Sequence, residues 1–274
     1  MDFTSEVAVS VKRSPAEALK TAFSKLSVPI VPPKNTMRTV IKPSIYNPSL
    51  PGNTDVAIVR AVTRMFGSLG PVHIVESDNP LRTADDAFSR SGYDSVKSEN
   101  VELVNLSDAD MVNVTFPGNF FNARMMPAIL SPGGFLISVA TLKAEPEVCT
   151  IGAGIKNLFG LLPEVDKSIY HKSIDNVLID ILSIYRPQLS IIDLTQMTIG
   201  DRAEGRVRHI GGVIVGTDPV SVDAFGATLL GYDPLKIPYL KTAYELGFGE
   251  ALPDLIRVKG TQHQIDELER RCII

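Results

Sequence analysis

The sequence predicts an α/β protein with a mainly parallel sheet flanked by helices in Rossmann-like layers. Apolar, β-branched runs alternate with segments of helical periodicity along most of the chain, as expected for β-α-β units. The run FLISVATL at 135–142 is apolar on both faces, which is typical of a strand buried inside a parallel sheet. A chain of 274 residues with 44% hydrophobic and 21% charged residues is long enough to bury a sizeable core.

The N-terminal residues 1–36 are predicted to form a helical extension. The segment SPAEALKTAFSKL has Ser14 as a helix N-cap and Pro15 at the first helical position. Three prolines in VPIVPP then interrupt regular structure. The remaining residues 37–274 are predicted to form a single α/β domain, or two closely packed α/β halves.

The rest of the chain is interpreted as alternating strands and helices. TVIKPSI is a strand that Pro43 ends, Thr54 caps the following helix, and PVHIVES is the next strand, which completes a β-α-β unit. The further predicted strands are 101–106, 111–116, 135–142, 189–194, 211–215 and an edge strand at 255–260. The further predicted helices are 83–92, a short one ending at 127–130, a glycine-rich one at 150–160, 173–185, one from 218, 236–246 and 262–271.

The segment 210–234 combines an apolar strand, a glycine-rich turn and a helix start. Asp218 is predicted to cap this helix with Pro219 at its first position, and Asp223 lies just over one turn further. Ligands of α/β proteins commonly bind where a strand meets a helix N-terminus, so both carboxylates are candidates for a loop crevice. The alternative is that Asp218 only caps the helix and Asp223 is only solvated.

Polar residues also occur where several predicted strands end: Lys42, Glu76, Lys143, Asp193 and Asp218. The carboxyl ends of parallel strands line one crevice, so these side chains are expected to converge on one site. The alternative is that polar residues stand at strand ends simply to return the chain to water.

The glycine-rich segment GAGIKN contains Lys156 and Asn157. It matches neither the GxxxxGK[ST] nor the GxGxxG nucleotide pattern, so only a looser anion-binding role for Lys156 is considered, beside a solvated lysine. His171 lies in a polar turn where substrate could reach an imidazole. No HExxH or GxSxG motif occurs, so neither a local zinc site nor a serine hydrolase elbow is indicated.

Composition excludes several functional classes. A net charge of −4 argues against nucleic acid as a partner. No apolar run reaches the ~18 residues of a membrane span and the N-terminus does not resemble a secretory leader, so no membrane partner and a cytoplasmic location are expected. With two cysteines, Cys149 and Cys272, the chain is not expected to hold an iron–sulfur cluster or a cysteine-rich zinc site. Cys149 is interpreted as a small buried residue.

Nine segments together resemble a known family. In chain order they are VIKPSI, PGNTD, the strand ending in Glu76, AFSRSGY, the strand ending in Lys143, IKNLFG, His171 with Asp175, LSIIDL, and GTDPVSVDAFGATLLGYDP. Over roughly residues 38–250 the chain is similar to the family catalogued as domain of unknown function 362. The resemblance implies an α/β fold, and many members carry a ferredoxin-like segment with cysteine clusters that this chain lacks.

The chain departs from the family pattern at two motifs that contain candidate site residues. The chain has Lys42-Pro43-Ser44 where members have Lys-Pro-Asn, and Lys143-Ala144-Glu145 where members have Lys-Thr-His. If the family histidine binds metal or transfers a proton, the resemblance implies that Glu145 changes or abolishes that chemistry.

The leading functional hypothesis is an enzyme that binds a small anionic metabolite in the crevice. Lys42, Lys143, Lys156 and Asn157 would bind substrate, and His171, Asp223 and Glu76 would serve in acid–base catalysis. Asp193 and Asp218 are candidates for a divalent metal. The alternatives are a non-catalytic module that docks to a redox or metalloenzyme partner, and a degenerate relative that retains only the fold. Each of these hypotheses is compatible with a protein partner or a homo-oligomer.

Overall fold

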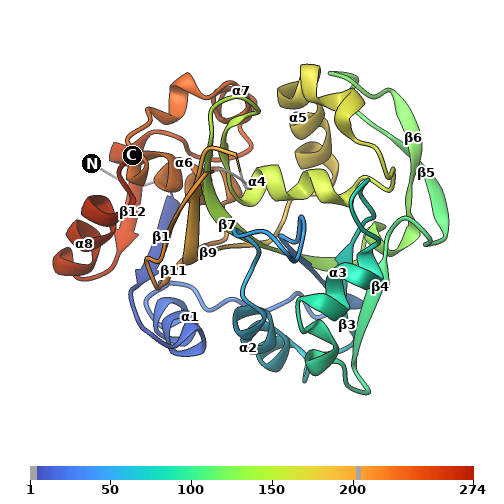
Figure 1. Ribbon diagram of the computed structural model, residues 1–274, viewed down its shortest axis with the longest axis horizontal. Helices are drawn as coiled ribbons and strands as arrows, with labels where there is room; N and C mark the ends of the chain where they lie inside the picture. Colours follow the sequence, from blue (N-terminus) through green and yellow to red (C-terminus); the bar gives the residue numbers. More distant parts are fainter. Residues whose placement is uncertain (1–4, 202–204) are drawn as a thin grey trace.

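A computed structural model describes residues 5–201 and 205–274, which form an α/β fold around one large sheet (Figure 1). The strands of this sheet are β1 (Ser5–Ser10), β2 (Arg38–Pro43), β3 (Val72–Glu76), β4 (Val101–Asn105), β7 (Gly134–Glu145), β8 (Thr150–Gly152), β9 (Leu189–Ile199), β10 (Arg206–Arg208), β11 (Val213–Gly216) and β12 (Ile256–Lys259). Across the sheet the order is β12-β1-β11-β9-β7-β2-β3-β4, with β8 paired to β7 and β10 paired to β9.

The sheet is mixed but mostly parallel, which confirms the predicted fold class. β9, β7, β2, β3 and β4 run parallel to one another and β1 is parallel to β12, whereas β11 is antiparallel to both of its neighbours. Parallel neighbours bring their carboxyl ends to the same edge of the sheet. The direction of β11 therefore separates its end from the ends of β2, β3 and β7.

Helices cover both faces of the sheet (Figure 1). They are α1 (Pro15–Phe23), α2 (Val56–Phe66), α3 (Ala84–Arg90), α4 (Gly154–Asn157), α5 (Ile174–Ile184), α6 (Pro219–Leu229), α7 (Pro238–Glu245) and α8 (Gln262–Cys272). Successive side chains of β2 point to opposite faces of the sheet. Ile41 packs against α1, α2 and α3 on one face. Val40 packs on the other face in the cluster that includes residues of α4 to α8. Two hydrophobic layers thus enclose the sheet.

The N-terminal segment differs from the predicted helical extension. Helix α1 begins at Pro15 with Ser14 as its N-cap, as predicted, but residues 5–10 form β1 inside the sheet. β1 pairs with β11 and β12, and Val7, Ala8 and Val9 are buried. The N-terminal residues are therefore part of the sheet, because the apolar run VAV is buried between two strands from the end of the chain.

Residues 111–115 form a strand, as predicted, but this strand lies outside the large sheet. They form β5 (Met111–Thr115), which pairs with β6 (Ala123–Pro127) in a separate antiparallel ribbon at one side of the molecule (Figure 1). Buried Asp180 of α5 anchors the connecting loop, since its carboxylate accepts backbone N–H donors from Asn119, Phe120 and Phe121 at 2.7–3.2 Å.

Candidate functional site

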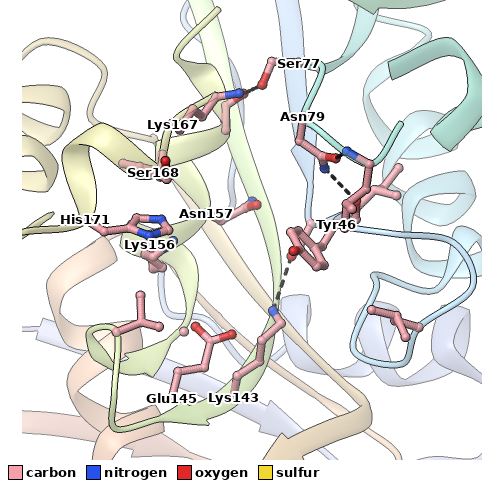
Figure 2. Close-up of a pocket in the computed structure, with 18 of the residues that line it drawn as sticks. Tyr46, Ser77, Asn79, Lys143, Glu145, Lys156, Asn157, Lys167, Ser168 and His171 are labelled. Carbon is pink, nitrogen blue, oxygen red and sulfur yellow. Dashed lines mark hydrogen bonds between the residues drawn. The ribbon is translucent and has the colours of Figure 1, made fainter. Parts of the chain in front are cut away.

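A cavity of about 810 Å³ lies beyond the carboxyl ends of β2, β3 and β7. The predicted residues that line it are Lys42, Glu76, Lys143, Lys156, Asn157 and His171. Figure 2 shows Lys143 and Glu145 at one end, with Lys156, Ser168, His171 and Lys167 along one wall and Tyr46, Asn79 and Ser77 along the other. Parallel strands and the segment after β8 thus bring together residues that are far apart in sequence.

Lys42 and Glu76 form a buried ion pair at the base of the cavity. They end the neighbouring parallel strands β2 and β3, and Lys42 Nζ lies 2.9 Å from Glu76 Oε2 with both side chains at most 4% exposed. Burial lowers the pKa of Lys42, and the charge of Glu76 opposes this shift. Gly160 permits this packing, because a Cβ atom there would lie 2.7 Å from Lys42 Cε.

Both carboxylate oxygens of Glu76 accept further hydrogen bonds. Oε1 accepts the N–H of Ser77 at 2.9 Å, and Oε2 accepts the N–H of Ile45 at 3.3 Å. The guanidinium of Arg82 lies 3.8 Å from Oε1. Glu76 thus holds the cavity wall together through these contacts, and its acid–base role stays a prediction.

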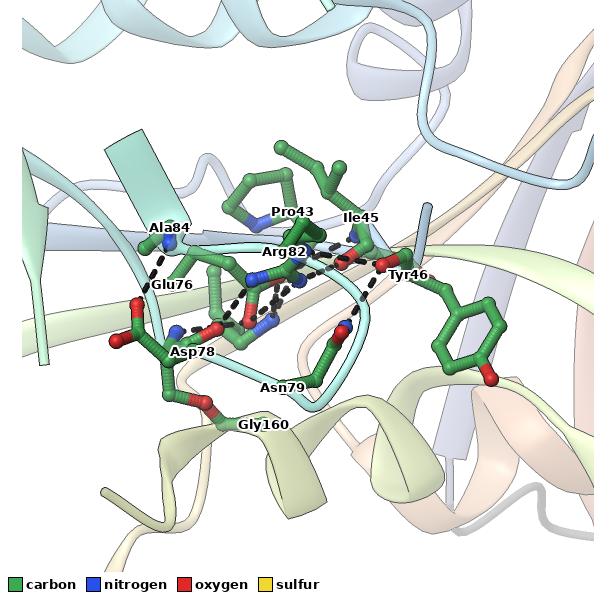
Figure 3. A network of polar contacts seen from close by, with 12 residues as sticks. Pro43, Ile45, Tyr46, Glu76, Asp78, Asn79, Arg82, Ala84 and Gly160 are labelled. Carbon is green, nitrogen blue, oxygen red and sulfur yellow. Dashed lines mark hydrogen bonds and ion pairs between the residues drawn. The ribbon is translucent and has the colours of Figure 1, made fainter. Parts of the chain in front are cut away.

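Arg82 joins the two loops that form one wall. Its guanidinium donates to the carbonyl oxygens of Ser77 and Ile45, and its Nε donates to the carbonyl of Tyr46 at 3.0 Å (Figure 3). Asn79 Nδ2 donates to the same Tyr46 carbonyl at 2.8 Å. These contacts fix the position of Tyr46, whose side chain extends along the cavity (Figure 2).

Asn157 fixes α4 against the strands. Its Nδ2 donates to the carbonyl of Lys42 at 2.7 Å and to Ser138 Oγ at 3.1 Å. Its Oδ1 is 3.5 Å from Lys42 Nζ. The amide of Asn157 therefore positions the neighbouring Lys156.

The wall that carries Lys156 and His171 is cationic and aromatic. Lys156 Nζ lies 4.4 Å from the centre of the Phe159 ring, and the His171 ring lies 5.7 Å from the same ring. Burial lowers the pKa of His171 below its usual 6.5, and the charge of Lys156 adds to this effect. His171 is therefore mainly neutral at pH 7 and can accept or donate a proton.

Lys167 is a second cation of this wall that sequence analysis missed. Its amine donates to the carbonyl of Asp78 at 2.8 Å and to the carbonyl of Glu164. Burial lowers its pKa to about 8, with Glu76 opposing the shift and Lys42 and Arg82 adding to it. Lys167 lies in a polar turn without a strand-end or glycine-rich pattern, so no local signal marks it.

The opposite end of the cavity contains Lys143 and Glu145, both on β7. Lys143 is 3% exposed, and its amine lies 3.3 Å from Ser44 Oγ. Burial raises the pKa of nearby Cys149 to about 12, so its thiol stays protonated, in agreement with its predicted role as a small buried residue.

Asp193 and Asp218 do not line the cavity, in contrast to their predicted convergence there. β9 continues to Ile199, so Asp193 lies within a strand, where it accepts the N–H groups of Asp55 and Thr195 at 2.8 Å. β11 is antiparallel to β9, and Asp218 beyond it caps α6. Backbone donors engage both carboxylates, and their role as metal ligands stays a prediction.

Asp223 is also placed away from the cavity. It is fully buried in α6, and its two oxygens accept the N–H groups of Gly154 at 2.7 Å and Ile155 at 2.9 Å. Asp223 therefore holds the start of α4, which carries Lys156. Asp223 does not face the crevice, in contrast to the prediction, and its catalytic role stays a prediction.

Buried carboxyls predict a pH-dependent stability. Burial raises the pKa of Asp223 from 3.8 to about 7, so between these values the folded chain retains a proton that the unfolded chain has lost. The free energy of unfolding should therefore fall as pH rises from 4 to 7, by roughly 3 kcal/mol for this group. Urea unfolding at several pH values should show a smaller decline for Asp223→Asn, and an identical decline would contradict the assignment.

Within 5–201 and 205–274, no three His, Cys, Asp or Glu side chains gather into a group suited to a metal ion. In the same residues, no helix has the length and apolar character needed to cross a bilayer.

Comparisons with known proteins point to one family. The family described as Domain of unknown function (DUF362) matches residues 39–228, a segment that contains every residue lining the cavity. A thylakoid-associated protein of Synechocystis is 23% identical over 236 residues, covering 80% of this chain and 70% of that protein. A solved protein from Thermotoga maritima is 11% identical with a TM-score of 0.37, covering 72% of this chain and 54% of that one. This chain thus spans about half of the Thermotoga protein.

Proposed function

This chain belongs to the DUF362 family, as its sequence segments indicated, and we propose that it is an enzyme that binds a small anionic metabolite in the cavity. The family description assigns no activity, so the proposal depends on the cavity itself. The observation that carries it is the gathering of Lys42, Lys143, Lys156 and Lys167 around a single space of about 810 Å³. Sites for small molecules commonly have volumes of roughly 300–1,000 Å³.

The charges of two of these lysines are available to a ligand. Among the described residues, no carboxylate forms an ion pair with Lys156 or Lys167. Two carboxylates of the lining are engaged by backbone donors, because Asp78 accepts the N–H of Ala84 at 2.7 Å and Asp166 accepts the N–H of Ser168 at 2.9 Å. An anion between Lys156 and Lys167 would gain charge-assisted hydrogen bonds.

The proposed chemistry uses the groups nearest this anion site. His171, next to Lys156 on the same wall, is the proposed acid–base group because it is mainly neutral at pH 7. Lys143, at one end of the cavity, and Asn157, next to Lys156 on α4, would orient the ligand, and Asn157 also maintains α4. The predicted cytoplasmic location is retained as part of this proposal; the Synechocystis relative is described as thylakoid-associated.

Lys156→Gln should weaken anion binding about 10-fold, because it removes one charge-assisted contact of about 1.5 kcal/mol while keeping most of the side-chain volume. The measurement is calorimetric titration with inorganic phosphate and with citrate. The matched control is Lys172→Gln, since Lys172 is an exposed lysine outside the cavity lining. Equal affinities for wild type and Lys156→Gln would contradict the proposed anion site.

A second candidate function is a non-catalytic module that docks to a redox or metalloenzyme partner. The observation that favours it is the β5–β6 ribbon, where Val112, Phe120 and Met125 are 37%, 40% and 51% exposed. Exposed apolar groups of this kind often mark protein interfaces. Loss of complex formation with Phe120→Ser and Met125→Ser, without any change in phosphate binding, would favour this candidate over the enzyme.

A further inference from the structure

We propose that Lys167 is a nucleophilic amine that forms an imine with a small anionic aldehyde or ketone bound in the cavity. This inference rests on the proposed anion-binding function and names the substrate class and the reacting atom, Lys167 Nζ. The structural basis is the position of this amine on the cavity wall and the two carbonyl groups that accept its hydrogen bonds.

A neutral amine at Lys167 can donate both of the observed hydrogen bonds. The residue lies between the 3-10 helices η3 (Leu158–Leu161) and η4 (Ser168–Ser173), and its amine donates to the carbonyls of Asp78 and Glu164. A neutral amine has two N–H donors and one lone pair. With both donors directed at carbonyl oxygens, the lone pair points away from them, as attack on a bound carbonyl requires.

Two other lysines of the cavity have contacts that favour the charged form. Lys42 is paired with Glu76 at 2.9 Å and is almost fully buried. Lys156 lies over the Phe159 ring, where a cation is stabilised by the aromatic face. Lys167 has neither a carboxylate partner nor a ring beneath it among the described residues. These differences distinguish a reacting amine at Lys167 from a charged anchor at Lys156.

The charges around Lys167 increase the fraction of neutral amine at moderate pH. Glu76 is held by Lys42 and Arg82, which limits its ability to stabilise a cation at Lys167. Burial and the neighbouring cations lower the pKa of Lys167 to about 8. At pH 7 this gives on the order of 100-fold more neutral amine than in an exposed lysine. The titratable groups on the surrounding segments are Lys42, Glu76, Asp78, Arg82, Glu164, Asp166 and His171.

The covalent step is balanced without a redox partner. The lone pair of Lys167 Nζ forms a bond to the carbonyl carbon while the C=O π electrons move to oxygen, which gives a carbinolamine after proton transfer from nitrogen. The hydroxyl group then leaves with the second amine proton as water, and the nitrogen lone pair forms the C=N bond. The ligand's anionic group would remain against Lys156, near His171.

The experiment uses pyridoxal 5′-phosphate as the anionic aldehyde, with sodium borohydride to reduce any imine and peptide mass spectrometry to locate it. We expect adducts mainly at Lys167, about 10-fold fewer with the uncharged analogue pyridoxal, and loss of labelling when inorganic phosphate competes. Labelling should increase as pH rises towards 8 and then level off, because the neutral fraction of Lys167 follows that titration. The exposed Lys172 is the internal reference in the same digest.

Lys167→Arg keeps a cation and hydrogen-bond donors but cannot form an imine, so it should lose the adduct whatever its affinity for inorganic phosphate. An adduct spread evenly over Lys167 and exposed lysines would overturn the inference. Phosphate binding by wild type with no adduct at Lys167 would overturn the imine alone. Absence of both phosphate binding and adduct would overturn the proposed function as well.

Discussion

Asp223→Ala is expected to lower the free energy of unfolding by about 3 kcal/mol, because it leaves buried N–H donors without an acceptor. The wild-type carboxylate accepts the N–H groups of Gly154 and Ile155 at 2.7 and 2.9 Å in a fully buried position. Gly154 allows this approach, since a Cβ atom there would lie 2.9 Å from Asp223 Oδ1. The substitution therefore removes the anchor of α4.

Urea unfolding followed by far-ultraviolet circular dichroism measures this effect, because the chain contains no tryptophan for fluorescence. The control is Asp254→Ala, which removes an exposed carboxylate and should change stability by less than about 0.5 kcal/mol. The loosened α4 should also weaken phosphate binding, since it carries Lys156. Unchanged stability of Asp223→Ala would show that the carboxylate does not support α4 and would reopen a direct role in chemistry.

Lys42→Met is expected to cost about 3–5 kcal/mol of stability, because it leaves the buried carboxylate of Glu76 without its nearest cation. Arg82, at 3.8 Å, compensates only in part. Adding Glu76→Gln to Lys42→Met should restore much of the loss, since the second change removes the uncompensated charge. The difference between the double variant and the sum of the single variants measures the coupling between the two side chains.

The exposed pair Lys241 and Glu245 provides the matched control. Its atoms are 3.8 Å apart and its side chains are more than half exposed, so Lys241→Met should change stability by less than about 1 kcal/mol. If Lys42→Met were equally mild, the Lys42–Glu76 pair would not be the structural base of the cavity. If the double variant were as unstable as the sum of the singles, the two charges would not be coupled.

Local sequence patterns determined most individual elements. The predicted N-caps of three helices are confirmed: Ser14 for α1, Thr83 for α3 and Asp218 for α6. In each case the capping residue directly precedes a segment of helical periodicity. Capping depends on atoms within a few residues of the chain, so the signal is local. The N-cap of α2 was predicted one residue too early. Asp55 caps this helix, whereas Thr54, the predicted N-cap, forms hydrogen bonds with Ser44 and Val139 of other segments.

The sequence also predicted part of the site. Lys42, Glu76 and Lys143 follow apolar runs that belong to neighbouring parallel strands, so their side chains reach one cavity. Turn and glycine patterns indicate Lys156, Asn157 and His171, and these residues line the same cavity. Their roles in binding and acid–base chemistry remain proposals.

Only the tertiary structure decided which remaining residues reach the cavity. A run of apolar residues predicts a strand but not its direction, and the antiparallel β11 takes Asp218 away from the site. The carboxylate of Asp223 accepts the N–H of Gly154 at the start of α4, which is distant in sequence. The amine of Lys167 is held by the carbonyl groups of Asp78 and Glu164. Strand direction and contacts between distant segments depend on the packing of the whole chain, whereas capping and periodicity depend on neighbours in sequence.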